Sequence, residues 1–175
     1  MKKMNIAFIG AGHITEILTK NILKNGYSAD CIYISDPNTE RTEELSNTLK
    51  IQTALGNAEA IKGAEIIFIC VHPHIVPYVI EDIRTLDLTN KIFISVSAGV
   101  PLSLYTSEIN TIKAIRILPN PPSKIGEGAV PVAVNKNIDT FDKDKILPII
   151  KVFGKCYQVG EDKIDIFTSL TSPAP

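Results

Sequence analysis

The chain has 175 residues, of which 45% are hydrophobic and 21% charged, and its formal net charge is −1. This length suits one domain with a full core and is short for two. The near-neutral charge argues against a nucleic-acid partner, and no apolar run reaches the ~20 residues of a membrane helix, so we expect no membrane partner either.

Short apolar runs alternate with segments whose apolar residues recur at helical spacing. We expect buried strands at 5–9, 31–34, 65–71, 91–96, 113–118, 129–134 and 156–159. We expect helices at 13–25, 39–49, 75–83, 142–153 and 162–170. Asn57 can cap a further short helix. Pro148 should kink the helix at 142–153 or move its start later, and Ser103 and Tyr105 are expected on an exposed helix.

Apolar runs without polar alternation are typical of parallel strands that are covered on both faces. Strands that alternate with helices at this spacing indicate βαβ units. The sequence therefore predicts an α/β fold, namely a Rossmann-like, doubly wound, mostly parallel sheet with helices on both faces.

A glycine-rich turn joins the first predicted strand to the first predicted helix. Gly10 permits a tight turn, and Gly12, which lacks a side chain, allows a pyrophosphate to approach the backbone at the helix N-terminus. Thr15 stands where the usual fingerprint has a third glycine. The pattern favours dinucleotide binding. The alternative is a turn that needs glycine for geometry alone.

The choice between NAD and NADP depends on the end of the second predicted strand. Asp36 lies where an acidic residue usually accepts the adenosine ribose hydroxyls of NAD, about 20 residues beyond the glycines. Ser35 and Arg41 could instead meet the 2′-phosphate of NADP. Asp36 could also simply begin a turn with Pro37. The sequence leaves these alternatives open.

The three cysteines, Cys31, Cys70 and Cys156, are far apart and form no C-x-x-C pair. A disulfide framework or metal site is therefore not expected, and a reducing cytoplasm fits the chain. Cys70 is expected in the core without an activated thiolate. His72 and His74 lack a third ligand, so we expect no metal there.

Five segments together resemble pyrroline-5-carboxylate reductases. They are residues 57–60, 71–73, 94–100, 116–122 and 126–129. The resemblance covers essentially the whole chain, and the asparagine-proline segment with the following Gly-Glu-Gly-Ala is its most specific part.

The resemblance implies an oxidoreductase that uses NADP or NAD to reduce a cyclic imine, 1-pyrroline-5-carboxylate, to proline. The small-molecule substrate is implied with it. The residues implied to bind the cofactor, ordered from pyrophosphate and adenosine to nicotinamide, are Gly10, Gly12, His13, Ile14, Ser35, Asp36, Asn57, Val71, His72, Pro73, Ala98, Gly99 and Asn120.

The sequence departs from the family at several positions. The family usually has lysine at the position of His72 and threonine at that of Pro121, and it has a Gly/Ser-rich segment where this chain reads 171–175. No residue stands out as the proton donor for the imine, so the catalytic residues stay unassigned. These departures keep an alternative open, a non-catalytic regulatory relative that binds a dinucleotide. A Rossmann domain for a methyl-donor cofactor is disfavoured by the asparagine-proline segment.

The last predicted helix implies a division of the chain at residue 160. We expect a dinucleotide-binding domain at 1–160, with 161–175 as the start of a further helix. The resemblance implies that this helix leads to a helical dimerisation domain absent from this chain. A homodimer is expected only if that domain is present. The 175 residues alone are expected not to reduce pyrroline-5-carboxylate at a useful rate.

Overall fold

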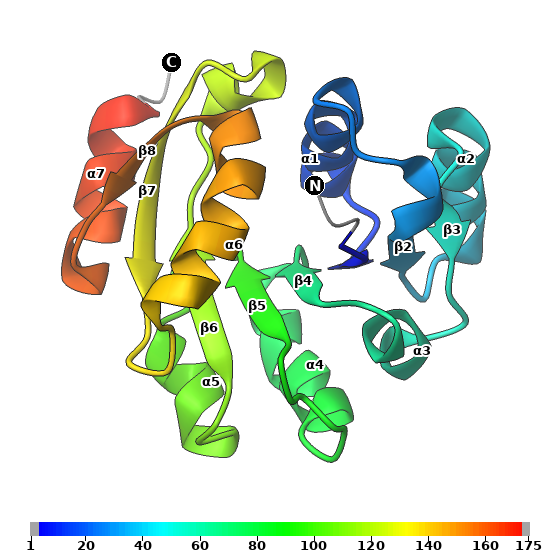
Figure 1. Ribbon diagram of the computed structural model, residues 1–175, viewed down its shortest axis with the longest axis horizontal. Coiled ribbons are helices and arrows are strands. Elements are labelled where there is room, and N and C mark those ends of the chain that lie inside the picture. Colours follow the sequence, from blue (N-terminus) through cyan, green and yellow to red (C-terminus); the bar gives the residue numbers. More distant parts are fainter. Residues whose placement is uncertain (1–3, 173–175) are drawn as a thin grey trace.

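A computed structural model describes residues 4–172 (Figure 1). The prolines at 173 and 175, which belong to the segment 171–175 where the sequence departs from the family, lie outside the described residues. Within this range the backbone forms a mostly parallel sheet whose strand order is β3-β2-β1-β4-β5-β6-β7-β8. The strands are β1 (Ile6–Ile9), β2 (Ile32–Ser35), β3 (Gln52–Thr53), β4 (Ile66–Ile69), β5 (Ile92–Ser95), β6 (Lys113–Ile117), β7 (Gly128–Val134) and β8 (Gly154–Gln158). The helices are α1 (His13–Lys24), α2 (Thr39–Leu49), α3 (Asn57–Lys62), α4 (Val76–Ile83), α5 (Leu102–Glu108), α6 (Thr140–Ile150) and α7 (Ile164–Thr171).

The predicted fold class is confirmed. Strands β1 to β6 are parallel to one another, β7 is antiparallel to β6, and β8 is parallel to β7. The strand order reverses between β1 and β4, because the chain first adds strands on one side of β1 and then on the other. Such a reversal is where open α/β sheets bind their ligands.

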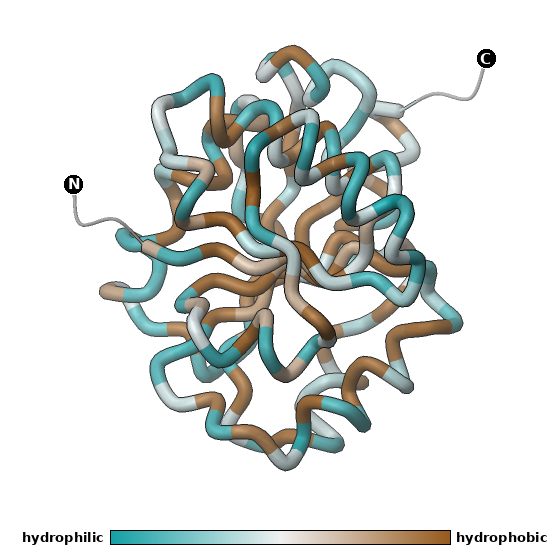
Figure 2. The backbone as a smooth tube through the Cα atoms, turned by 90° about the vertical axis from the view of Figure 1, so that its right-hand side faces the viewer, coloured by the Kyte–Doolittle hydropathy of each residue, from teal (hydrophilic) through white to brown (hydrophobic). Residues whose placement is uncertain are grey.

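The sheet separates two apolar cores, because successive side chains on a strand point to opposite faces. In β1, Ile6 and Phe8 join the core under α1, α2 and α6, whereas Ala7 and Ile9 join the core under α3, α4, α5 and α7. Figure 1 shows α6 and α7 on opposite sides of β7 and β8. The apolar segments gather in the interior of the molecule (Figure 2).

Several expectations about single elements are corrected by the structure. Helix α6 begins at Thr140 and contains Pro148, so the proline does not delay its start; the side chain of Asp139 caps it by accepting a hydrogen bond from the Asp142 amide. Gly56, rather than Asn57, occupies the N-cap of α3. Tyr105 on α5 is buried, not exposed as expected, because α5 packs its apolar residues against β6 and α4.

The short edge strand β3 was not expected from the sequence. Its two residues, Gln52 and Thr53, are both exposed, and so they lack the apolar run that identifies the other strands. No helix in residues 4–172 has both the length and the apolar character to cross a membrane.

We predict that Phe68→Ala destabilises the chain by ~3–5 kcal/mol, because it removes a buried ring and leaves a cavity. Phe68 stacks on Phe8 at 4.9 Å between ring centroids and meets the edge of Phe153 at 6.1 Å. Denaturant unfolding measures the loss. Tyr78→Ala, at a side chain that is 66% exposed, is the control and should change stability little. Equal losses for the two variants would show that the stacked rings are not central to the core.

Candidate functional site: the cleft at the carboxyl ends of the strands

The loops that follow β1, β2 and β4 meet where the strand order reverses. The Gly10 amide donates to the Ser35 carbonyl at 2.8 Å, and the Cys70 amide donates to the Ile9 carbonyl at 2.8 Å. The end of β1 is thus bonded on one side to the end of β2 and on the other to the end of β4. Most of the residues that the sequence assigns to the cofactor follow these strands or β5.

Gly10 is required by the fold itself. Its φ of +103° is in the region that favours glycine, and a Cβ at this position would lie 2.7 Å from the carbonyl oxygen of Cys70. The Thr15 hydroxyl donates to the Gly10 carbonyl at 2.7 Å. Thr15, which replaces the third glycine of the usual fingerprint, therefore fixes the turn with its buried side chain.

Gly12 is not required by the fold. Its φ is −72°, which any residue can adopt, and a Cβ added to it would meet nothing within 4 Å. Gly12 is exposed at the N-cap of α1 and provides no side-chain cap, so a ligand can reach the first amides of α1, at His13 and Ile14. The start of this 12-residue helix combines unprotected N–H groups, a partial positive charge and open space, which fits a pyrophosphate.

Asp36 lies beside this turn with its carboxylate held in place. Its Oδ2 accepts a hydrogen bond from the Ala11 amide at 2.7 Å, and its Oδ1 accepts one from the Asn38 amide at 2.8 Å. The bond to Asn38 is the turn contact that the sequence offered as one alternative. A carboxylate can accept about four hydrogen bonds, so the same side chain still has capacity for two ribose hydroxyls.

Ser35 and Asn57 are brought together, but they are engaged with each other. The buried Ser35 hydroxyl donates to Asn57 Oδ1 at 3.0 Å, and Asn57 Nδ2 donates to Asp82 Oδ2 at 2.9 Å. Ser35 therefore links the end of β2 to the start of α3 and does not present its hydroxyl to a phosphate in this arrangement.

The loop after β4 carries Val71, His72 and Pro73, and both His72 and Pro73 are exposed. The His72 ring stacks on His74 at 5.8 Å between centroids. The described residues contain no group of three or more His, Cys, Asp or Glu side chains placed to hold a metal ion. The Ser97 hydroxyl donates to the Val71 carbonyl at 2.8 Å, which fixes this loop to the next one.

Ala98 and Gly99 follow β5 and are exposed at the same edge of the sheet. Gly99 has a φ of +70°, and a Cβ there would meet nothing within 4 Å. This loop requires glycine for its backbone conformation, and it leaves room for a ligand above it.

Asn120 lies in the loop after β6, and its amide is used within the chain. Its Oδ1 accepts hydrogen bonds from the Ala129 amide at 3.0 Å and the Ser123 hydroxyl at 3.3 Å, and its Nδ2 donates to the Thr171 carbonyl at 2.9 Å. The resemblance placed Asn120 where substrate meets nicotinamide. The structure gives it three partners that together position β7 and the end of α7.

Sequence reasoning assigned no role to Arg116, a buried cation on β6. Its Nη2 lies 2.7 Å from Asp165 Oδ1 on α7, and its Nη1 lies 3.9 Å from Glu161 Oε1, which also accepts from the Leu102 amide. An arginine flanked by isoleucines, Ile115 and Ile117, in the apolar part of β6 is the signal that could have revealed it, because buried charges need partners. Through these contacts α7 is fixed to the sheet, where Ile164 is fully buried.

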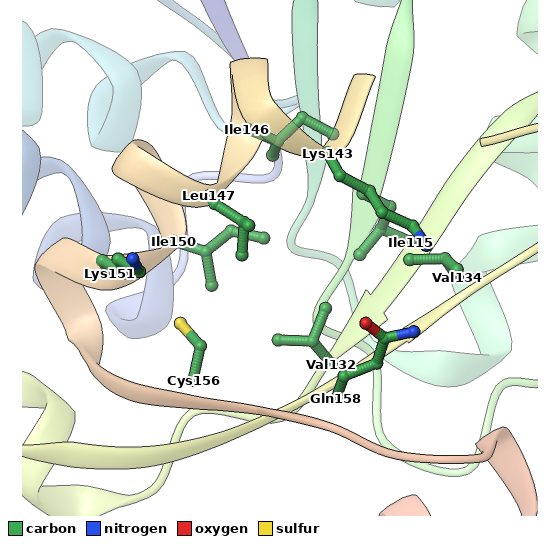
Figure 3. A pocket seen from close by; sticks show the side chains of 10 residues that line it. All are labelled: Ile115, Val132, Val134, Lys143, Ile146, Leu147, Ile150, Lys151, Cys156 and Gln158. Carbon is green, nitrogen blue, oxygen red and sulfur yellow. The ribbon is translucent and has the colours of Figure 1, made fainter. Parts of the chain in front are cut away.

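A pocket of about 270 Å³ lies elsewhere, between α6 and strands β6 to β8 (Figure 3). Its floor is formed by apolar side chains such as Ile115, Val132 and Ile146, with Lys143 and Lys151 at separate places on its rim. It lacks converging polar groups, which a specific ligand site needs, so the cleft at the carboxyl ends of the strands is the better candidate.

We predict that Gly10→Ala destabilises the chain by at least ~2 kcal/mol, because it adds a Cβ where φ is positive and the Cys70 carbonyl is in contact. Thermal or denaturant unfolding checks this. Gly63→Ala is the control, because a Cβ there would meet nothing within 4 Å. A Gly10→Ala chain as stable as wild type would contradict the close approach of β1 and β4.

We predict that Cys70 resists thiol reagents in the folded chain. Burial raises the pKa of its thiol to about 12, and the neighbouring Thr15 side chain offsets this only in part; the reactive thiolate is therefore scarce at neutral pH. Peptide mass spectrometry after labelling should find Cys31 and Cys156, which are partly exposed, modified before Cys70. Rapid modification of Cys70 without denaturant would contradict the buried placement.

Comparison with known proteins identifies the family. A family model described as NADP oxidoreductase coenzyme F420-dependent matches residues 5–99, which include β1 to β5 and the loops of the cleft. The pyrroline-5-carboxylate reductase of Haemophilus influenzae is 32% identical over 149 residues, covering 82% of this chain and 55% of that protein. The enzyme of Vibrio alginolyticus is 28% identical and covers 100% of this chain and 65% of its own length.

Solved structures agree on the fold. A pyrroline-5-carboxylate reductase from Coxiella burnetii superposes with a TM-score of 0.92 at 24% identity, covering 99% of this chain and 66% of its own. A pyrroline carboxylate reductase from Plasmodium falciparum, with NADP bound, has a TM-score of 0.83 at 24% identity, covering 98% of this chain and 63% of its own. The chain thus spans a little over half to two thirds of its relatives' length. The resemblance to pyrroline-5-carboxylate reductases drawn from the sequence is confirmed, and the chain belongs to the family described as NADP oxidoreductase coenzyme F420-dependent.

Proposed function

We propose that this chain is the cofactor-binding part of an NAD(P)H-dependent reductase that converts 1-pyrroline-5-carboxylate, a small cyclic imine, to proline. The observation that carries the proposal is Gly12, a glycine that neither φ nor packing requires, at the uncapped start of α1 beside the strand-order reversal. The curated relatives bear the name of this activity. One solved relative has NADP bound, and an imine reductase from Myxococcus stipitatus has NAD⁺ bound.

Each part of the cleft has a distinct role in this proposal. Gly12 and the first amides of α1 bind the pyrophosphate, and Asp36 accepts the adenosine ribose hydroxyls. The loop of Val71 and the loop of Ala98 line the nicotinamide end, and the Ser97 hydroxyl fixes these two loops to each other. When bound, the nicotinamide supplies the hydride, so the protein needs to orient it and exclude water.

The imine pocket and the proton donor are proposed to lie in the part of the relatives' length that this chain does not span. Arg116, a buried cation between the sheet and α7, is paired with acidic side chains, and Asn120 is occupied by contacts within the chain. We also propose a domain boundary after residue 160, with α7 leading toward a helical domain, and a homodimer only where that domain is present.

A non-catalytic, dinucleotide-binding regulatory relative is the second candidate. It is favoured by His72, which stands exposed where the family usually has lysine, and by the engagement of the Asn120 amide. Both candidates require dinucleotide binding, whereas only the first requires imine reduction when the chain is joined to the helical domain of a relative.

We predict that Gly12→Ser weakens dinucleotide binding at least ~10-fold without loss of stability. Serine is a favourable N-cap residue, so α1 should be as stable or slightly more stable. Its Cβ and hydroxyl would occupy the space and the helix amides that the pyrophosphate needs. Calorimetric titration with NADH and with NADPH measures the first effect, and thermal unfolding measures the second.

Gly63→Ala is the matched control, because it also adds a Cβ in open space but lies at the end of α3. It should leave dinucleotide affinity unchanged. An unchanged affinity in Gly12→Ser would remove the α1 N-terminus from the site and with it the main support for the proposal.

A further inference from the structure

Two side chains of opposite charge hold the backbone of one residue of the glycine-rich turn, Ala11, from its two ends. The Ala11 amide donates to Asp36 Oδ2 at 2.7 Å, and the Ala11 carbonyl accepts from Arg41 Nε at 3.1 Å. Ala11 is buried. Asp36 and Arg41 therefore stand side by side at the carboxyl end of β2, where the adenosine ribose of a bound dinucleotide lies.

Arg41 is held by carboxylates on both of its terminal nitrogens. Its Nη2 lies 2.5 Å from Glu16 Oε2 on α1, and its Nη1 lies 2.7 Å from Glu44 Oε2 on α2. Lys20 also pairs with Glu16, at 2.6 Å. We call Glu16 and Glu44 the carboxylate clamp of Arg41.

The balance of charge around the ribose position is negative. Three carboxylates, those of Asp36, Glu16 and Glu44, face the two cations Arg41 and Lys20. The hydroxyl of Ser35, the other group suited to a phosphate, donates to Asn57 instead. No cation of this cluster is left without a carboxylate partner, so a dianionic 2′-phosphate would have to displace existing ion pairs.

We propose that Asp36 and the carboxylate clamp make this chain select NAD(H) over NADP(H). The inference rests on the proposed function and adds the specificity of the same cleft. Asp36 accepts the 2′- and 3′-hydroxyls of NAD(H) and repels the 2′-phosphate of NADP(H), because like charges at this distance repel. Arg41, which could otherwise bind that phosphate in a bidentate manner, is retained by Glu16 and Glu44.

The first test is titration of the wild-type chain with NADH and with NADPH, followed by calorimetry or by nicotinamide fluorescence. The expected result is that NADH binds at least ~10-fold tighter than NADPH. Two effects weaken NADPH binding together: Asp36 repels its 2′-phosphate, and Arg41 is not available to bind that phosphate. Equal affinities, or a preference for NADPH, would overturn the inference and leave the proposed function in place. Binding of neither dinucleotide would overturn both.

The second test removes the two carboxylates that hold Arg41. The double variant Glu16→Gln/Glu44→Gln keeps the side-chain volumes but releases Arg41, so NADPH affinity should rise roughly threefold to tenfold, with NADH affinity little changed. Adding Arg41→Ala to the double variant should abolish the gain. Thermal unfolding verifies that each variant is folded.

Glu43→Gln is the matched control for general charge. Glu43 is exposed on α2 directly before Glu44, so its substitution removes the same charge without touching Arg41. It should leave the ratio of the two affinities near the wild-type value. If Glu43→Gln shifts the ratio as much as the double variant Glu16→Gln/Glu44→Gln does, the selectivity follows from the general charge of this surface, and the role of the clamp is refuted.

Discussion

The close approach of Gly10 to Cys70 constrains the whole cleft. Strand β1 lies between β2 and β4, and its end is hydrogen-bonded to both of them, so the backbone must leave the sheet in the small space above Cys70. A Cβ on Gly10 would lie 2.7 Å from the Cys70 carbonyl oxygen. Only glycine fits, at positive φ, and α1 can then begin at His13. The helix N-terminus is thereby placed over the point where the strand order reverses.

The rest of the site is arranged around that turn in two parts. At the proposed adenosine end, Asp36 accepts from the Ala11 amide and Arg41 donates to the Ala11 carbonyl, so the turn is held by the two charged groups to which we assign cofactor selectivity. At the proposed nicotinamide end, hydrogen bonds between side chains and backbone position the loops: the Ser97 hydroxyl donates to the Val71 carbonyl, and Asn120 Oδ1 accepts from the Ala129 amide. The end of α7 belongs to this second part, because the Thr171 carbonyl accepts from Asn120.

Much of this was predictable from the sequence, for physical reasons. Parallel strands covered on both faces must be apolar throughout, so strands such as Ile66–Ile69 can be identified from their apolar runs. Helix α2 was predicted at its observed bounds. Strand β3 has two exposed residues and leaves no such signal. Helix α5 spans seven residues, too few to show a buried face, and so Tyr105 was misplaced. The sequence named Ser35, Asn120 and Arg41 but could not show their partners, since these depend on contacts between distant segments.

Amide chemical shifts on addition of NADH test the central claim most directly, namely that the α1 N-terminus and its neighbouring loops form the dinucleotide cleft. The account predicts the largest shifts at residues 10–15, 36 and 97–99, with saturation at a single affinity. It predicts small shifts at the apolar pocket of Figure 3, around Ile146 and Cys156. Shifts concentrated at that pocket, with residues 10–15 unmoved, would contradict the account.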